Sequence, residues 1–166
     1  MVYSKKNIFF CFFISISMIL MTGCENEVKS DFKHFLNVDL LKISEFESDA
    51  INEFNQITLQ EEDTDAYYQK MYSLLSTSTL PTYETFVKEL SDIKPETNDV
   101  RQLHQIYLRG AQKQLEAFKL FKQGIEEKNE YKITEANQLL AEAKTYMNTY
   151  LTEAVKLADE LDLKWR

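Results

Sequence analysis

Two histidines and two cysteines are the side chains of this sequence that could act as strong transition-metal ligands or as covalent nucleophiles: His34, His104, Cys11 and Cys24. On a helix, Asp31 and His34 would lie one turn apart, which is the geometry of one ligand pair. A di-iron bundle, however, needs Glu-x-x-His on two helices and two further glutamates, and the sequence has no Glu-x-x-His. We therefore expect Asp31 and His34 to form a polar helix start, with no metal site and no catalytic residue.

Both cysteines lie close to an apolar run. Lys5 and Lys6 precede residues 8–21, an apolar segment that contains Cys11, and Cys24 follows the segment. A membrane-spanning helix needs about 20 apolar residues, whereas the apolar region of a secretory signal has about 7–15. The run predicts a cleaved signal peptide. The alternatives are a signal anchor that stays in the membrane and an ordinary leader that happens to end near a cysteine.

The segment Met21-Thr22-Gly23-Cys24 resembles the lipobox of bacterial lipoproteins: a hydrophobic residue, two small residues and a cysteine. The resemblance implies that the Cys24 thiol carries diacylglycerol and that the signal peptidase cleaves between Gly23 and Cys24. The class favours leucine where this sequence has Met21, which is still long and apolar. The predicted division is a signal peptide at 1–23, a lipidated tether at 24–29 and a helical bundle domain at 30–166.

Maturation of this kind would leave no free thiol, because Cys11 leaves with the leader and Cys24 is acylated. A disulfide, a cysteine nucleophile and a thiolate metal site are then excluded from the mature chain. Its fold must depend on its hydrophobic core. About 140 residues are enough for such a core.

The chain is acidic, with 19 basic and 27 acidic residues and a net charge of −8. Removal of Lys5 and Lys6 leaves 17 basic residues against 27 acidic ones, or −10. Such a domain repels nucleic acid and anionic lipid, whose binding depends on basic groups. We therefore expect no nucleic-acid partner, and membrane contact through the lipid on Cys24.

Helix breakers are scarce after the leader: Pro81, Pro95, Gly110 and Gly124 are the only prolines and glycines beyond Gly23. This scarcity predicts long helices. A first helix should begin at a cap formed by Ser30 or Asp31. Its apolar stripe comprises Phe32, Phe35, Leu36, Leu40, Ile43, Ala50, Ile51, Phe54 and Ile57. A short helix should follow over 67–75, then a loop or cap at Ser76–Thr79, and a third helix from Pro81 that ends before Pro95.

The last two expected helices have the most regular apolar pattern. The first stripe comprises Val100, His104, Tyr107, Ala111, Gln114, Phe118, Phe121 and Ile125. The second comprises Ala136, Leu140, Ala143, Met147, Tyr150, Ala154, Leu157 and Leu161. A polar turn at 128–130 joins them, which predicts an antiparallel helical hairpin with Gly110 at a close crossing. The predicted fold class is all-α, an antiparallel bundle of four to five helices with a long C-terminal hairpin.

Side chains that could bind a ligand are few. Tyr67, Tyr68, Tyr72 and Tyr83 cluster in the shorter helices, where their rings could form a cleft. Tyrosines with buried rings are also ordinary bundle packing. His104 falls within an apolar stripe, so it is either a core histidine bonded to a neighbour or a ligand.

The lipobox together with a small acidic helical domain rich in Lys, Asn and Ile resembles uncharacterised surface lipoproteins of low-GC Gram-positive bacteria. The resemblance implies a lipid-anchored protein on the extracytoplasmic face of the cell membrane. We expect a non-enzymatic interaction or accessory module that takes a protein or cell-wall partner and needs no cofactor. The alternative is a lipoprotein that binds a small ligand or a metal.

Overall fold

A computed structural model describes residues 26–58 and 65–163 of the chain. Its elements are a helical stretch over residues 26–34, η1 (Phe35–Leu40), α2 (Leu41–Thr58), α3 (Asp65–Leu74), η2 (Leu75–Thr79), α4 (Leu80–Asp92), α5 (Asn98–Glu126) and α6 (Glu130–Glu160). These described residues contain helices and no strand, so the predicted all-α class is confirmed. The predicted leader, Gly23 and Cys24 lie outside the described residues.

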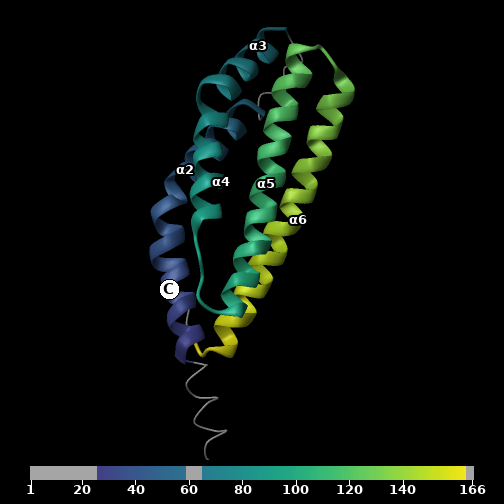
Figure 1. Cartoon of the computed structure of the whole chain (residues 1–166). Helices are drawn as coiled ribbons and strands as arrows, with labels where there is room; N and C mark the ends of the chain where they lie inside the picture. Colours follow the sequence, from purple (N-terminus) through teal and green to yellow (C-terminus); the bar gives the residue numbers. More distant parts are fainter. Residues whose placement is uncertain (1–25, 59–64, 164–166) are drawn as a thin grey trace, which may run out of the picture.

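The described elements form four helical runs that alternate in direction (Figure 1). The first run covers residues 26–58 and the second covers residues 65–92, each with a π-helical segment inside it. The other two are α5 and α6, which form the predicted antiparallel hairpin. The first run, the start of α5 and the end of α6 meet at one end of the bundle, and α3 and the α5–α6 turn lie at the other end.

The prediction of a loop or cap at Ser76–Thr79 is wrong, because these residues belong to the π-helix η2 between α3 and α4, and the Thr79 side chain makes no capping hydrogen bond to α4. Pro81 provides the physical reason. A proline inside an α-helix lacks an N–H group, and its ring clashes with the carbonyl four residues earlier. The wider π turn, in which the Leu80 amide bonds the Leu75 carbonyl, lets the helix pass the proline without breaking. Ser78 Oγ also donates to Glu53 Oε1 at 2.7 Å, which ties η2 to α2.

The predicted helix start at Ser30 or Asp31 is also wrong, because residues 26–29 are already helical. Val28 packs against the core, and Lys29 Nζ donates to the Leu161 carbonyl at 2.6 Å. These contacts with the end of α6 stabilise a helical turn that has no apolar pattern of its own. The last four residues of the predicted tether are therefore part of the first helix.

α5 is buried along two faces. Seven of its eight predicted stripe residues are buried, and Gln114 is partly exposed. The structure adds Leu103, Gly110, Ala117 and Gly124 as a second buried set. α5 lies between α4 and α6 (Figure 1) and contacts both of them. The single predicted stripe therefore covers only part of its buried surface.

Small residues bring α5 and α6 close together. A Cβ added to Gly110 would lie 3.1 Å from Tyr146 Cβ and 3.2 Å from Met147 Cε. A Cβ added to Gly124 would lie 2.7 Å from Ile133 Cδ1. The predicted close crossing at Gly110 is confirmed.

The buried residues of α6 reflect the close packing of this helix against α5. It includes the buried residues Ala136, Ala143, Tyr150, Ala154 and Leu161 as expected, with Leu139 and Ala158 buried beside it. The predicted positions Leu140, Met147 and Leu157 are only partly buried. The buried side of α6 is therefore rotated slightly from the predicted one, toward the small residues of α5.

The turn between α5 and α6 is short and well capped. Lys128 has a φ of 51°, and the amides of Lys128 and Asn129 bond the carbonyls of Ile125 and Gly124 at 3.2 and 2.8 Å. This pattern is a Schellman motif. The Asn129 side chain then caps α6 by accepting from the amides of Tyr131 and Lys132.

Phe118 offers a test of the core. Its side chain is fully buried on α5, with ring centroids 4.6 Å from Phe54 and 5.2 Å from Tyr83. Phe118→Ala should lower the free energy of unfolding by roughly 3–5 kcal/mol, because it leaves a cavity between three helices. Urea unfolding followed by circular dichroism measures this, with the exposed Gln112→Ala on the same helix as the matched control. A loss below about 1 kcal/mol would contradict the packing described here.

Candidate functional site

Four helices each contribute one polar side chain to the middle of the bundle: Glu47 from α2, Tyr83 from α4, Tyr107 from α5 and Tyr150 from α6. We call this set the internal polar cluster. Tyr107 Oη donates to Glu47 Oε2 at 2.5 Å. The rings of Tyr107 and Tyr150 stack with centroids 4.7 Å apart and planes at 16°. The three tyrosine side chains are buried.

Burial controls the protonation of the internal polar cluster. Desolvation raises the pKa of the Glu47 carboxyl above its usual value, and the hydrogen bond from Tyr107 offsets part of that rise. Desolvation, followed by the nearby charge of Glu47, raises the pKa of the Tyr83, Tyr107 and Tyr150 hydroxyls well above the usual value. The three hydroxyls therefore remain protonated, and Glu47 is the group of this cluster that titrates at accessible pH. Tyr107 Oη donates to Glu47, whereas the buried Tyr83 Oη has no hydrogen-bond partner among the described residues.

Aromatic rings surround the internal polar cluster. The ring of Tyr83 packs 5.3 Å from Phe86 and 5.2 Å from Phe118, and Phe86 lies 6.0 Å from Tyr107. Two surface grooves, of about 460 and 450 Å³, are lined by other residues. The cluster thus links four helices, and neither of these two grooves leads a ligand to it.

Glu47 is the residue of the internal polar cluster that the sequence analysis missed. It lies four residues after Ile43 and three before Ala50, both buried, so the apolar stripe of the first helix passes through it. A charged residue in phase with such a stripe is the signal that could have identified it. Its partner Tyr107 was expected in the core only as an apolar position.

The four tyrosines of the predicted cleft lie in two different parts of the bundle. Tyr67, Tyr68 and Tyr72 are partly buried on α3, where the rings of Tyr67 and Tyr68 meet edge to face at 5.3 Å. Lys122 Nζ lies 5.6 Å from the ring centroid of Tyr72. Tyr83 is fully buried in the internal polar cluster. A ligand role for these tyrosines stays a prediction, and Tyr83 would contribute to it from inside the core.

Tyr68 also borders one of these two grooves, at the end of the bundle that carries the α5–α6 turn. The groove has a volume of about 450 Å³. Its lining includes Asp65, Gln69, Gly124, Lys128 and Ile133. It therefore combines one aromatic ring with charged and amide groups from α3, the α5–α6 turn and α6.

His104 is placed as a core histidine. It is 7% exposed, and its Nε2 lies 2.7 Å from the Leu90 carbonyl, which can only accept a hydrogen bond. Its ring meets Phe35 edge to face at 6.0 Å. Its Nε2 is thus bonded to the end of α4, as expected for a core histidine rather than a ligand.

Asp31 and His34 are not partners. His34 is exposed, and its Nε2 lies 3.5 Å from Asp39 Oδ1. The buried carboxylate of Asp31 instead accepts from the Glu96 amide at 3.1 Å, the Thr97 amide at 2.8 Å and Thr97 Oγ1 at 2.6 Å. Asp31 therefore joins the first helix to the start of α5.

The groove of about 460 Å³ runs beside these residues, between the first helix and the end of α4. Its lining includes Asp31, His34, Asp39, Glu89 and Asp92. Within the part of the chain that the structure describes, no group of three His, Cys, Asp or Glu residues is placed to hold a metal ion.

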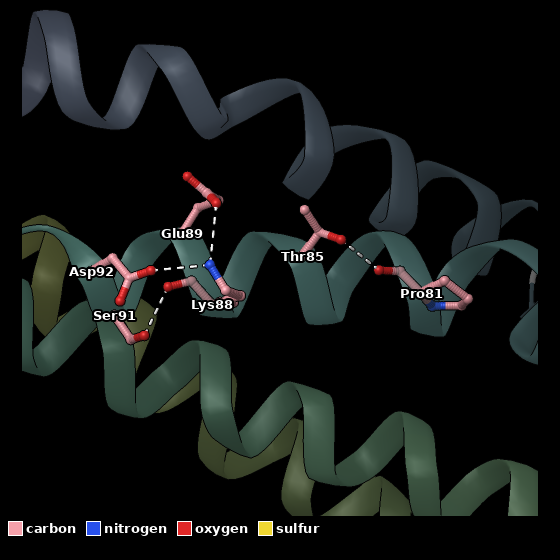
Figure 2. A network of polar contacts seen from close by, with 6 residues as sticks. All are labelled: Pro81, Thr85, Lys88, Glu89, Ser91 and Asp92. Atoms are coloured by element: carbon pink, nitrogen blue, oxygen red, sulfur yellow. Dashed lines mark hydrogen bonds and ion pairs between the residues drawn. The ribbon is translucent and has the colours of Figure 1, made fainter.

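Polar contacts also follow the outer side of α4 (Figure 2). Lys88 Nζ lies 3.1 Å from Asp92 and 3.6 Å from Glu89, and Ser91 Oγ donates to the Lys88 carbonyl. The hydrogen bond to Asp92 is the main cause of the raised pKa of Lys88. Lys88 is 70% exposed, so these pairs contribute little to stability and present no binding pocket of their own.

A family model described as EMYY-motif containing lipoprotein matches residues 5–162 of the chain. The sequence has one Tyr-Tyr pair, Tyr67-Tyr68, after Asp65-Ala66, and no literal Glu-Met-Tyr-Tyr. The comparisons with curated proteins and with solved structures found no match. No helix among the described residues has the length and apolar character that crossing a membrane requires.

The three hydrogen bonds to Asp31 lead to a second prediction. Asp31→Ala should lower the free energy of unfolding by about 2–3 kcal/mol, because the partly buried amides of Glu96 and Thr97 lose a charged acceptor. Asp99→Ala is the matched control, since Asp99 is an exposed acid in the first turn of α5. It should cost below about 1 kcal/mol. Equal losses in denaturant unfolding would contradict the role assigned to Asp31.

Glu47 and Tyr107 lead to a pH-dependent prediction. Because the folded pKa of Glu47 is raised, its stabilising contribution is full below the unfolded value of 4.5 and is lost as pH rises through the folded pKa. Glu47→Gln should therefore become more stable relative to wild type as pH rises toward neutrality. Tyr107→Phe should cost about 1–3 kcal/mol at pH 7 and less at pH 4, where the carboxyl it leaves unpaired is protonated.

Thermal unfolding between pH 4 and 8 measures both effects. Tyr131→Phe is the control, since Tyr131 is 78% exposed. A difference between Glu47→Gln and wild type that stays constant over this pH range would contradict the burial of the carboxylate.

Proposed function

Since the chain belongs to the family of EMYY-motif containing lipoproteins, we propose that Cys24 carries its lipid and that the bundle lies on the extracytoplasmic face of the membrane. The family makes the chain a bacterial lipoprotein. The Met21-Thr22-Gly23-Cys24 segment supports Cys24 as the acylated residue and Gly23–Cys24 as the cleaved bond. Two acyl chains are enough for stable anchoring, so the acidic bundle needs no membrane-binding face of its own.

We further propose that the bundle is a non-enzymatic interaction or accessory module for a protein or cell-wall partner, with no cofactor and no nucleic-acid partner. The main support is an apolar stripe on the outer side of α6. Leu151 and Val155 lie one turn apart and are 58% and 46% exposed, and the partly buried Met147 continues the stripe. Adjacent large apolar side chains that are exposed to solvent are typical of a contact surface.

The positions of the predicted ligand residues favour this proposal over a ligand-binding protein. His104 Nε2 is bonded to the Leu90 carbonyl, and Tyr83 is enclosed by Phe86 and Phe118. A ligand site built on either residue would have to open the core first.

The anchor is tested by Cys24→Ala in cells fed a labelled fatty acid. The variant should lose the label and should appear in the medium or as an uncleaved precursor. Thr22→Ser, which keeps a small residue before the cysteine, is the control and should be labelled and cleaved as in wild type. A wild-type chain that carries no label and keeps its leader in the membrane would show a signal anchor instead.

The partner proposal is tested by crosslinking the full-length chain in intact cells. Wild type should give a discrete crosslinked product, and Leu151→Lys with Val155→Lys should abolish it. Thr145→Lys with Thr149→Lys is the matched control, because both threonines are exposed on the same helix. An unchanged product in the Leu151/Val155 variant would exclude this stripe, and the absence of any product in wild type would contradict the interaction role.

A further inference from the structure

One end of the bundle gathers the start of the first helix with three later parts of the chain. We call this end the base, and it comprises residues 26–31, 93–99 and 159–163. Figure 1 shows the start of the first helix, the α4–α5 loop, the start of α5 and the end of α6 together there. The opposite end, which we call the tip, comprises residues 65–69 and 126–130, at the start of α3 and the α5–α6 turn.

Two long-range contacts fix the first helical turn to the base. Lys29 Nζ donates to the Leu161 carbonyl at 2.6 Å, which joins it to the end of α6. The Asp31 carboxylate accepts from the amides of Glu96 and Thr97 and from Thr97 Oγ1, which joins it to the start of α5. The turn that leads out of the bundle is thus held on two sides by segments far apart in the sequence.

Little chain separates this turn from the predicted lipid. Cys24 precedes Asn26, the first described residue, by two positions, and Asn26 is already helical. Two residues reach at most about 7 Å. The lipid attachment point must therefore lie within about 7 Å of Asn26, at the base.

The exposed charged side chains of the base are mostly acidic. They include the acids Glu27, Glu96, Asp99, Asp159, Glu160 and Asp162 and the basic residue Lys94. The large hydrophobic residues found exposed in the described part of the chain all lie outside the base. The described residues of the base therefore present no exposed large apolar side chain that could insert into lipid.

We propose that the bundle stands on the membrane with its base facing the lipid headgroups and its tip directed away from them. This inference rests on the proposed lipidation of Cys24. α6 has 31 residues, so the tip would be held roughly 45 Å above the base. The base is itself acidic, so the lipid on Cys24, and not charge, would hold it at the headgroups.

The predicted mature chain has no free thiol, so a single introduced cysteine can be labelled specifically to test the orientation. Single cysteines replace exposed residues at three heights: Asp99→Cys at the base, Lys144→Cys in the middle of α6 and Glu130→Cys at the tip. Each lipidated chain is labelled with a donor dye. It is then placed in vesicles of phosphatidylcholine and phosphatidylglycerol that carry an acceptor dye on their headgroups. Energy transfer should be strongest at position 99, weaker at 144 and weakest at 130.

The outcomes separate the orientation from the anchoring. Equal transfer at positions 99 and 130 in a lipidated, vesicle-bound chain would overturn the orientation alone. A chain without lipid on Cys24, absent from the vesicle fraction, would overturn the proposed anchoring and the orientation with it.

A second variant tests whether the short connection sets the orientation. A flexible Gly-Ser insertion of about 16 residues between Cys24 and Asn26 adds roughly 20 Å of mean reach, and should reduce the difference in transfer between positions 99 and 130. The same insertion between Lys128 and Asn129 at the tip is the matched control, because it leaves the connection to the lipid unchanged. An unchanged difference after the Cys24–Asn26 insertion would overturn the inference that this connection holds the bundle upright.

Discussion

Close packing between α5 and α6 is the contact on which the rest of the bundle depends. Gly110 and Gly124 leave no room for a side chain against Tyr146, Met147 and Ile133, so the two longest helices approach more closely than larger residues would allow. α5 then presents its other side, with Phe118 and Tyr107, to α2 and α4. The first two helical runs are positioned by the surface that this hairpin offers them.

The hairpin could be predicted from the sequence because its apolar period is regular and its turn is polar. The errors arose where tertiary contacts override local preference. Ser76–Thr79 has loop-forming residues before a proline, but a π turn and the contact with Glu53 keep the helix continuous. Residues 26–29 have no apolar stripe, and contacts with α6 hold them helical. Neither partner is close in sequence, so a local pattern cannot reveal either contact.

The candidate site was less predictable than the fold, because its residues depend on which helices face one another. The position of His104 in an apolar stripe was enough to expect a core histidine. The apolar pattern predicted that Tyr107 lies in the core, but it could not pair Tyr107 with Glu47, which lies 60 residues earlier. A partly buried carboxylate bonded to a tyrosine on another helix costs free energy that an apolar residue would not, and fixes how the helices pair. This accounts for a charged residue inside an otherwise apolar stripe.

An upright bundle would also restrict how a partner approaches. Leu151 and Val155 lie nine and five residues before the end of α6, so this exposed stripe would be held roughly 8–14 Å above the base. Because α6 runs from tip to base, this stripe would face sideways, parallel to the membrane plane. A partner bound there would have to reach the bundle from beside it, close to the lipid surface. A membrane protein with a short extracytoplasmic segment, or another anchored protein, satisfies this geometry better than a partner that approaches the tip.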